Sequence, residues 1–147
     1  VYFFILYFIY IIHVFDNYYY IDEDMNYIDK VKYEKIKDNC PIVQIDFTIK
    51  DNKLNFENKN DKKKLASLLK NIKKEGLDNK INSIAFLDNS TISMNTKEGI
   101  KVIIDKKGDM KHDMAKLTQI LTDLKSQNIN YGQIDMTFSK YTLYTYK

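Results

Sequence analysis

The stretch KLTQILTDLKSQNINYGQIDMTF, residues 116–138, predicts a helix, a short connection with one glycine, and a strand. Apolar residues recur with helical spacing and form one stripe from about Asp113 to Ser126. Asp109 or Asp113 can accept hydrogen bonds from the free amides at the start of this helix. From Ile134 to Phe138 apolar and polar residues alternate, as in a strand with one buried face. A helix with one apolar face needs a sheet to cover, so the stretch predicts helix packed on sheet.

A second amphipathic helix and a meander of strands are predicted before this stretch. From a cap at Asn60 or Asp61, apolar residues follow the i, i+3, i+4, i+7 spacing of a helix that ends near Gly76. We interpret the lysines on its polar side as a solvated face, with contact to anionic lipid or a wall polymer as the alternative. These lysines are Lys62, Lys63, Lys64, Lys70, Lys73 and Lys74. The strands are expected at Ile81–Leu87, Thr91–Asn95 and Ile100–Ile104.

The first third of the chain also favours strands. Val1–Phe15 is apolar or aromatic apart from His13, and it is shorter than the roughly 20 residues that span a bilayer as a helix. We interpret it as buried strand, and the tail of a membrane span or a disturbed reading frame are the alternatives. Because the sequence opens with valine, we expect that an upstream segment is missing. Ile45–Ile49 alternates strictly and predicts a further strand, either an insertion or an added edge strand.

The composition excludes several classes of protein. A chain of 147 residues with 44% hydrophobic residues is long enough for one domain with a two-layer core. The net charge is +3, but every basic residue is a lysine and the lysines are interleaved with acids. Without arginine the bidentate contacts to guanine and phosphate are lost, so we expect no nucleic-acid partner. The single cysteine, Cys40, excludes an internal disulfide and a thiolate zinc cluster.

No pattern of catalytic or metal-binding residues is present. Asp105, Asp109, His112 and Asp113 lie close in sequence but lack the ligand rhythm of a calcium loop, so we interpret them as capping and loop residues. The sequence has no serine elbow and no glycine-rich phosphate loop. The adjacent carboxylates of Asp22–Asp24 suit the end of a hairpin. We therefore expect no enzyme, no metal and no cofactor, and a hydrolase with dispersed carboxylates is the least favoured class.

These segments together resemble the extracytoplasmic β domain of the FtsQ/DivIB bacterial cell-division family. The family's "K-L-x-x-L-x-x-I/L-L" helix and "I/V-D-L-R-Y"-like strand are matched at Lys116, Leu117, Ile120, Leu121, Ile134 and Asp135, with an aromatic at Phe138. Thr137 replaces the common arginine. Tyr18–Asp24 fits the hairpin end "Y-Y-x-I-D-x-x-G", with Met25 in place of the turn glycine. Asn39–Val43 resembles "L-P-x-I/V-x-G", with Gln44 in place of its glycine.

The resemblance implies an α+β fold, a mostly antiparallel sheet with two amphipathic helices packed against one face. It covers about Asn17 to Lys147 and divides the chain into two parts. Residues 1–15 are an apolar segment, a buried strand or a remnant of a membrane anchor, and residues 16–147 are the FtsQ/DivIB-like β domain. We expect that the cytoplasmic tail, the POTRA domain and most or all of the anchor are lacking. The intact protein would be single-pass in the cell membrane, with this domain on the extracytoplasmic side at the division septum.

The last strand carries the candidate site. The segment KYTLYTYK, residues 140–147, alternates and should pair with Ile134–Phe138. If it lies at the sheet edge, a partner's strand can add to it. In FtsQ/DivIB proteins, the resemblance implies, this edge binds FtsB/DivIC-type partners, and FtsL-type proteins join the same complex. The partner-binding candidates are Phe138, Lys140, Tyr141, Thr142, Leu143, Tyr144, Thr145 and Tyr146.

Two functions therefore stay open at the level of sequence. From the residues alone, the last strand is more simply a closing element with Tyr141 and Leu143 on the core. The resemblance favours a non-catalytic divisome scaffold that binds its partners by strand addition during septum formation. The alternative is an extracytoplasmic module that binds cell-wall glycan through exposed tyrosines or an anionic surface through lysines.

Overall fold

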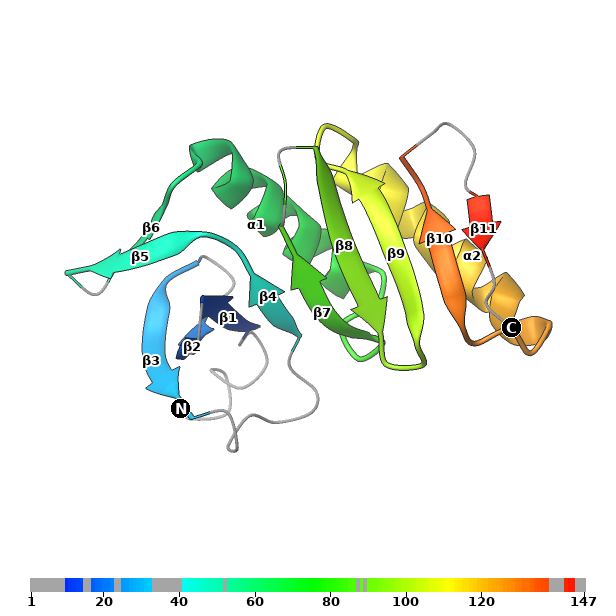
Figure 1. Ribbon diagram of the computed structural model, residues 1–147, viewed down its shortest axis with the longest axis horizontal. Helices are drawn as coiled ribbons and strands as arrows, with labels where there is room; N and C mark the ends of the chain where they lie inside the picture. Colours follow the sequence, from blue (N-terminus) through cyan, green and yellow to red (C-terminus); the bar gives the residue numbers. More distant parts are fainter. Residues whose placement is uncertain are drawn as a thin grey trace.

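A computed structural model of the chain describes residues 10–14, 17–22, 25–32, 41–51, 53–86, 88, 90–137 and 142–144. These residues form one large sheet, a separate two-stranded hairpin and two helices (Figure 1). The elements in chain order are β1 Tyr10–Val14, β2 Asn17–Ile21, β3 Tyr27–Val31, β4 Ile42–Gln44, β5 Phe47–Lys50, β6 Lys53–Phe56, α1 Lys59–Lys74, β7 Ile81–Ala85, β8 Thr91–Thr96, β9 Ile100–Asp105, α2 Met110–Ser126, β10 Gly132–Asp135 and β11 Thr142–Tyr144.

The large sheet has nine strands in the order β11-β10-β9-β8-β7-β4-β1-β2-β3. Most neighbours are antiparallel, and the predicted meander is β7, β8 and β9. Parallel pairs occur where the chain crosses over between strands: β1 with β4, β4 with β7, and β9 with β10. The helix α2 makes the last of these crossovers. The predicted α+β fold with a mostly antiparallel sheet is confirmed.

Both helices cover the same face of the sheet and contact each other (Figure 1). Each lays its apolar stripe on the strands, and the opposite side is polar. The strands alternate accordingly, as in β8, where Ile92 and Met94 are buried and their neighbours are less so. The helix side of the core consists of Leu65, Leu68, Leu69 and Ile72 from α1 and Met110, Met114, Leu117, Ile120 and Leu124 from α2.

The two helices begin with capping side chains. Of the two predicted caps of α2, Asp109 is the cap, because its carboxylate accepts from the Lys111 and His112 amides at 3.0 and 3.2 Å. For α1 the predicted cap was wrong. Asn58 is the cap and accepts from the Asn60 amide at 2.9 Å, while Asp61 lies inside the first turn. Asparagine and aspartate all favour a helix start, so the sequence did not decide between them.

The predicted strand Ile45–Ile49 was wrong in its bounds. Pro41, Val43, Ile45 and Phe47 are all buried, so one alternating pattern runs across two different strands. The chain pairs with the large sheet as β4 and then leaves it at Ile45, and β5 forms a hairpin with β6. Alternation reports which face is buried, not which sheet a strand joins.

The hairpin lies beside the strands at the β3 end of the large sheet (Figure 1). Phe47 on β5 packs edge-to-face against Tyr19 on β2, with ring centroids 5.7 Å apart. It also contacts Phe56 on β6 at 6.3 Å. An aromatic cluster therefore joins the hairpin to the sheet.

Part of the apolar opening segment is a strand. Tyr10–Val14 is β1 and lies inside the sheet between β4 and β2, while residues 1–9 and Phe15 fall outside the described residues. Neither of the two helices in the described part of the chain is long and apolar enough to cross a membrane.

Candidate functional site

The strand β11 is the last strand of the large sheet on one side (Figure 1). It pairs antiparallel with β10, and the register places Tyr144 opposite Gln133, Leu143 opposite Ile134, and Thr142 opposite Asp135. The predicted pairing of the last strand with the strand before it is therefore present, but the predicted bounds Ile134–Phe138 were wrong, because β10 begins at Gly132 and ends at Asp135. No described strand lies on the outer side of β11.

The hydrogen bonds between β10 and β9 determine which backbone groups of β11 point away from the sheet. The Met136 amide donates to the Ile103 carbonyl of β9 at 2.8 Å. Successive residues of a strand direct their N–H and C=O groups to opposite neighbours, so the amides of Gln133 and Asp135 face β11. The N–H and C=O groups of their partners Tyr144 and Thr142 must then point inward, towards β10. The N–H and C=O of Leu143 point outward, away from the sheet.

The position of β10 is fixed by the end of α2. Asn128 has a positive φ of 58°, and the Ile129 amide donates to the Leu124 carbonyl at 2.8 Å, which closes the last turn of the helix. Gly132, with φ of 130°, then starts β10 in a conformation that favours glycine. Ile134 is fully buried under α2 and holds the strand in register.

A small polar turn ends β10. The Asp135 carboxylate accepts from the Thr137 amide at 2.9 Å and from the Thr137 hydroxyl at 2.6 Å. Aspartate side chains that bond the backbone two residues later form such turns, and they redirect the chain. Thr137 thus serves the turn that ends β10.

The structure describes three of the predicted partner-binding residues, Thr142, Leu143 and Tyr144, and places them together on the edge strand. The other five, Phe138, Lys140, Tyr141, Thr145 and Tyr146, lie outside the described residues. Sequence reasoning missed Gln133 and Asp135 as the residues that orient β11. Only the register of the parallel pair with β9 reveals that role, and the local sequence carries no signal for it.

The opposite end of the sheet has a different edge. Among the described strands β3 is last on that side, and it carries the exposed charged residues Asp29 and Lys30. Its pairing with β2 is interrupted by a register shift at Tyr20 and Ile21. Charges and irregular pairing are common means of protecting a sheet edge from added strands. In contrast, the described register of β10 and β11 is regular.

The candidate metal residues act as loop and capping residues. Asp105 accepts from the Lys107 amide at 2.8 Å, and Asp109 caps α2. Asp113 is half-buried, and this burial raises the pKa of its carboxyl above the usual value of 3.8. Within the residues that the structure describes, no group of three or more His, Cys, Asp or Glu side chains is arranged to hold a metal ion.

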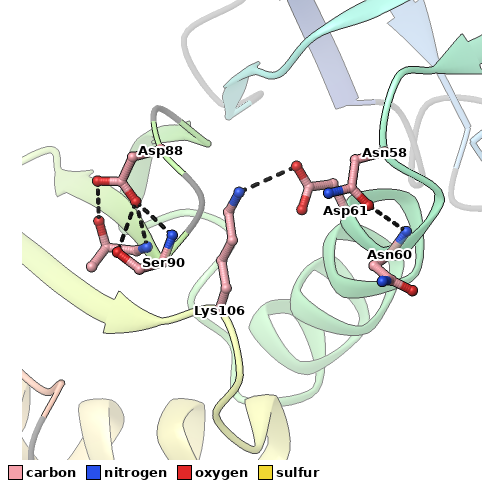
Figure 2. Close-up of polar contacts among 7 residues, drawn as sticks. Asn58, Asn60, Asp61, Asp88, Ser90 and Lys106 are labelled. Carbon is pink, nitrogen blue, oxygen red and sulfur yellow. Dashed lines mark hydrogen bonds and ion pairs between the residues drawn. The ribbon is translucent and has the colours of Figure 1, made fainter.

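Two other polar clusters lie in the β7–β8 loop and between the β9–α2 connection and the start of α1 (Figure 2). Asp88 accepts from the amides of Ser90 and Thr91 and from both hydroxyls. These hydrogen bonds, led by the Ser90 amide, lower the pKa of Asp88 to about 2. Nearby, Lys106 is buried and forms an ion pair with Asp61 of α1, 3.2 Å between Nζ and Oδ2.

The sequence matches a known protein-family model. A sequence model described as cell division protein FtsQ/DivIB, C-terminal, matches residues 10–137, from the start of β1 to just beyond β10. The comparison with curated proteins gave no match. The matched range includes both helices and the sheet up to β10, and the edge strand β11 follows it.

Proposed function

The chain belongs to the FtsQ/DivIB C-terminal family of cell-division proteins, and from this premise we propose that it binds FtsB/DivIC- and FtsL-type partners through β11. The family is one of non-enzymatic division scaffolds, so the proposed activity is binding. In this proposal the domain lies on the extracytoplasmic side of the membrane at the septum. There it would hold its partners so that they assemble at one place.

The observation that carries the proposal is the outward direction of the Leu143 backbone groups. An incoming strand can donate to the Leu143 carbonyl and accept from its amide, and both groups lie on an edge without a described neighbour. Main-chain hydrogen bonds of this kind supply affinity in strand addition, and side chains supply specificity. The regular register of β10 and β11 supports the proposal, because an added strand continues an existing ladder.

The β3 end of the sheet is a poorer acceptor. The exposed charges of Asp29 and Lys30 would have to be accommodated beside an added strand, and the register shift distorts the ladder behind them. These features of β3 support the proposal that strand addition occurs at the β11 end of the sheet.

Calorimetric titration of the chain with the extracytoplasmic segment of the FtsB/DivIC-type protein from the same source tests the proposal. The informative variant is Leu143→Pro, which removes the outward amide and leaves the inward hydrogen bonds of β11 in place. We expect its affinity to fall about tenfold or more, because a hydrogen bond is lost and its acceptor on the partner is left unpaired.

Two controls separate the backbone effect from other causes. Leu143→Ala keeps the amide and should bind more tightly than Leu143→Pro. Thr142→Pro removes an amide that faces β10, so it should lower the thermal stability of the domain itself. If the folded Leu143→Pro variant binds as tightly as Leu143→Ala, strand addition at this edge is wrong.

A further inference from the structure

A hollow of about 540 Å³ lies between β6 and the first half of α1. It is at the hairpin end of the domain, and β11 is at the opposite end (Figure 1). Strand β6 forms one wall, the helix α1 forms another, and Met25, just before β3, contributes to the lining. The lining residues are Met25, Leu54, Asn55, Phe56, Lys59, Lys62, Lys63 and Ala66.

The helix wall is strongly basic. Lys59, Lys62 and Lys63 have the i, i+3, i+4 spacing that places them on one face of α1, and Ala66 at i+7 continues the same face. All three lysines are exposed, and in the described part of the chain none of them pairs with a carboxylate. The acid of the same helix turn, Asp61, is instead paired with Lys106. The hollow therefore has positive charges on its rim and no acid in its lining.

The floor of the hollow is apolar. Leu54 and Met25 are 7% and 4% exposed, and Phe56 is half-buried beside them. The Lys62 ammonium lies 6.0 Å from the centre of the Phe56 ring. A basic rim above an apolar floor is complementary to a ligand that has an apolar group flanked by negative charge.

We propose that this hollow is a second docking site, for an acidic peptide segment of a partner protein that inserts one apolar side chain between β6 and α1. The concave shape favours a peptide over a lipid bilayer. The apolar residues of the site are recessed, and the one exposed large hydrophobic residue among those described, Tyr131, lies just before β10. A flat bilayer cannot reach recessed residues, whereas a side chain that projects from a peptide can.

The site would give the domain two separate contacts, one at each end of the sheet. Ala66 is the residue that tests the shape of the site, because a larger side chain there fills the hollow without changing any charge. The lysines test the charge. The two properties can therefore be varied independently.

The first experiment is a titration of the ¹⁵N-labelled chain with a peptide in which one leucine stands between pairs of glutamates. We expect saturable amide shifts on β6 and the first half of α1, with little change on β11. A peptide with serine in place of the leucine should bind about tenfold more weakly, because the apolar group is lost. Shifts that are absent, or that lie elsewhere on the domain, would overturn the proposal.

Matched variants then test the rim and the floor. Reversing Lys59, Lys62 and Lys63 to glutamate should reduce the affinity about tenfold or more, and the reduction should be smaller at high salt. The control reverses three other exposed lysines, Lys101, Lys107 and Lys111, and should bind like the parent chain. Ala66→Leu should also weaken binding while circular dichroism shows a folded domain.

Vesicles of equal parts phosphatidylglycerol and phosphatidylcholine test whether the lysines bind an anionic lipid surface and not an acidic peptide. The proposal expects the chain to bind the leucine peptide in preference to these vesicles and expects Ala66→Leu to affect peptide binding. If the vesicles bind more tightly and Ala66→Leu has no effect, the lysines recognise a lipid surface and the peptide proposal is wrong. Neither result depends on β11, whose partner is measured by the separate titration with Leu143→Pro.

Discussion

The Lys106 ammonium lies 3.2 Å from the Asp61 carboxylate and joins the connection between β9 and α2 to the first turn of α1 (Figure 2). Lys106 is only 7% exposed, and its ammonium also lies 5.4 Å from the centre of the Phe86 ring. Its amide donates to the Ser90 carbonyl at 2.9 Å. Lys106 thus links the β7–β8 loop and the β9–α2 connection to the start of α1.

Substitution of Lys106 should separate the effect of charge from that of packing. Lys106→Ala removes a buried stem and leaves Asp61 without its partner, so we expect a loss of about 2–3 kcal/mol in the free energy of unfolding. Lys106→Met keeps the apolar stem, and its loss should be smaller, about 1 kcal/mol. Urea unfolding measures both values.

The double variant Lys106→Met with Asp61→Asn provides the control. If the charge pair matters, Asp61→Asn should cost less in the Lys106→Met background than in the parent chain, because the partner charge has already been removed. Equal costs in the two backgrounds would show that the ion pair contributes nothing to stability.

The lowered pKa of Asp88 predicts that the stability of the domain decreases in acid. In the folded protein the pKa is about 2, and its ordinary value is 3.8. The unfolded chain therefore binds more protons between these values, so stability is present above about pH 4 and falls as the pH decreases towards 2. Asp88→Asn should flatten that part of the stability curve.

Asp88 is fully exposed, so salt should reduce the electrostatic part of this effect. Asp123→Asn is a suitable control, since no described residue donates a hydrogen bond to the Asp123 carboxylate. Thermal melts between about pH 2 and pH 5 measure the slope for each variant. An unchanged slope in Asp88→Asn would contradict the prediction.

Asp113 should show the opposite pH dependence. Burial is the main cause of its raised pKa, so the folded state favours the protonated carboxyl. The contribution of the Asp113 carboxyl to the free energy of unfolding is fully present below its ordinary pKa of 3.8. It is lost as the pH rises through the higher pKa that the carboxyl has in the folded protein. Asp113→Asn should therefore stabilise the domain at neutral pH, with the difference disappearing under acidic conditions.

The same residue touches the loop before α2. A Cβ atom at Gly108 would come within 2.7 Å of the Asp113 carboxylate, so the loop and the side chain are closely packed. Gly108→Ala should lower the melting temperature of the parent chain.

Chemical denaturation at pH 7 and in acid measures the effect of Asp113→Asn. Equal stabilities of the parent and the Asp113→Asn variant at both pH values would disprove the burial argument.

Much of the fold could be predicted because it depends on local patterns. The helical stripes and the alternation of β7, β8 and β9 appear directly in the sequence, and the ends of these elements differ from the predicted ones by no more than three residues. The hairpin strand β6 was missed. Its sequence Lys53–Phe56 has two apolar residues among polar ones, and its burial comes from packing against Phe47 and α1.

The candidate site was predictable only in part. Alternation and terminal position predicted a last strand that pairs with the strand before it, and the edge position was only a condition of the proposed site; among the described strands β11 lies at the edge of the sheet. The outward direction of the Leu143 amide depends on the register between β9 and β10, a long-range property that short sequence patterns do not encode. The basic hollow was also missed, because residues from Met25 to Ala66 meet there only after folding.

The turn before β3 offers a test of strain against burial. Met25 has a positive φ of 65°, a conformation that favours glycine, and yet its side chain is 4% exposed. The left-handed conformation costs a non-glycine residue about 1–2 kcal/mol. Removing a buried methionine side chain costs about 2–5 kcal/mol, so burial should outweigh strain.

We therefore expect Met25→Gly to destabilise the domain by about 1–3 kcal/mol despite relief of the strained backbone. Met25→Ala should be worse by about 1 kcal/mol, since it loses the same contacts and keeps the unfavourable φ. Urea unfolding of the three proteins gives the order Met, Gly, Ala from most to least stable. If glycine were more stable than methionine, the backbone strain would exceed the contribution of the buried side chain, and the packing of Met25 against the core would be weak.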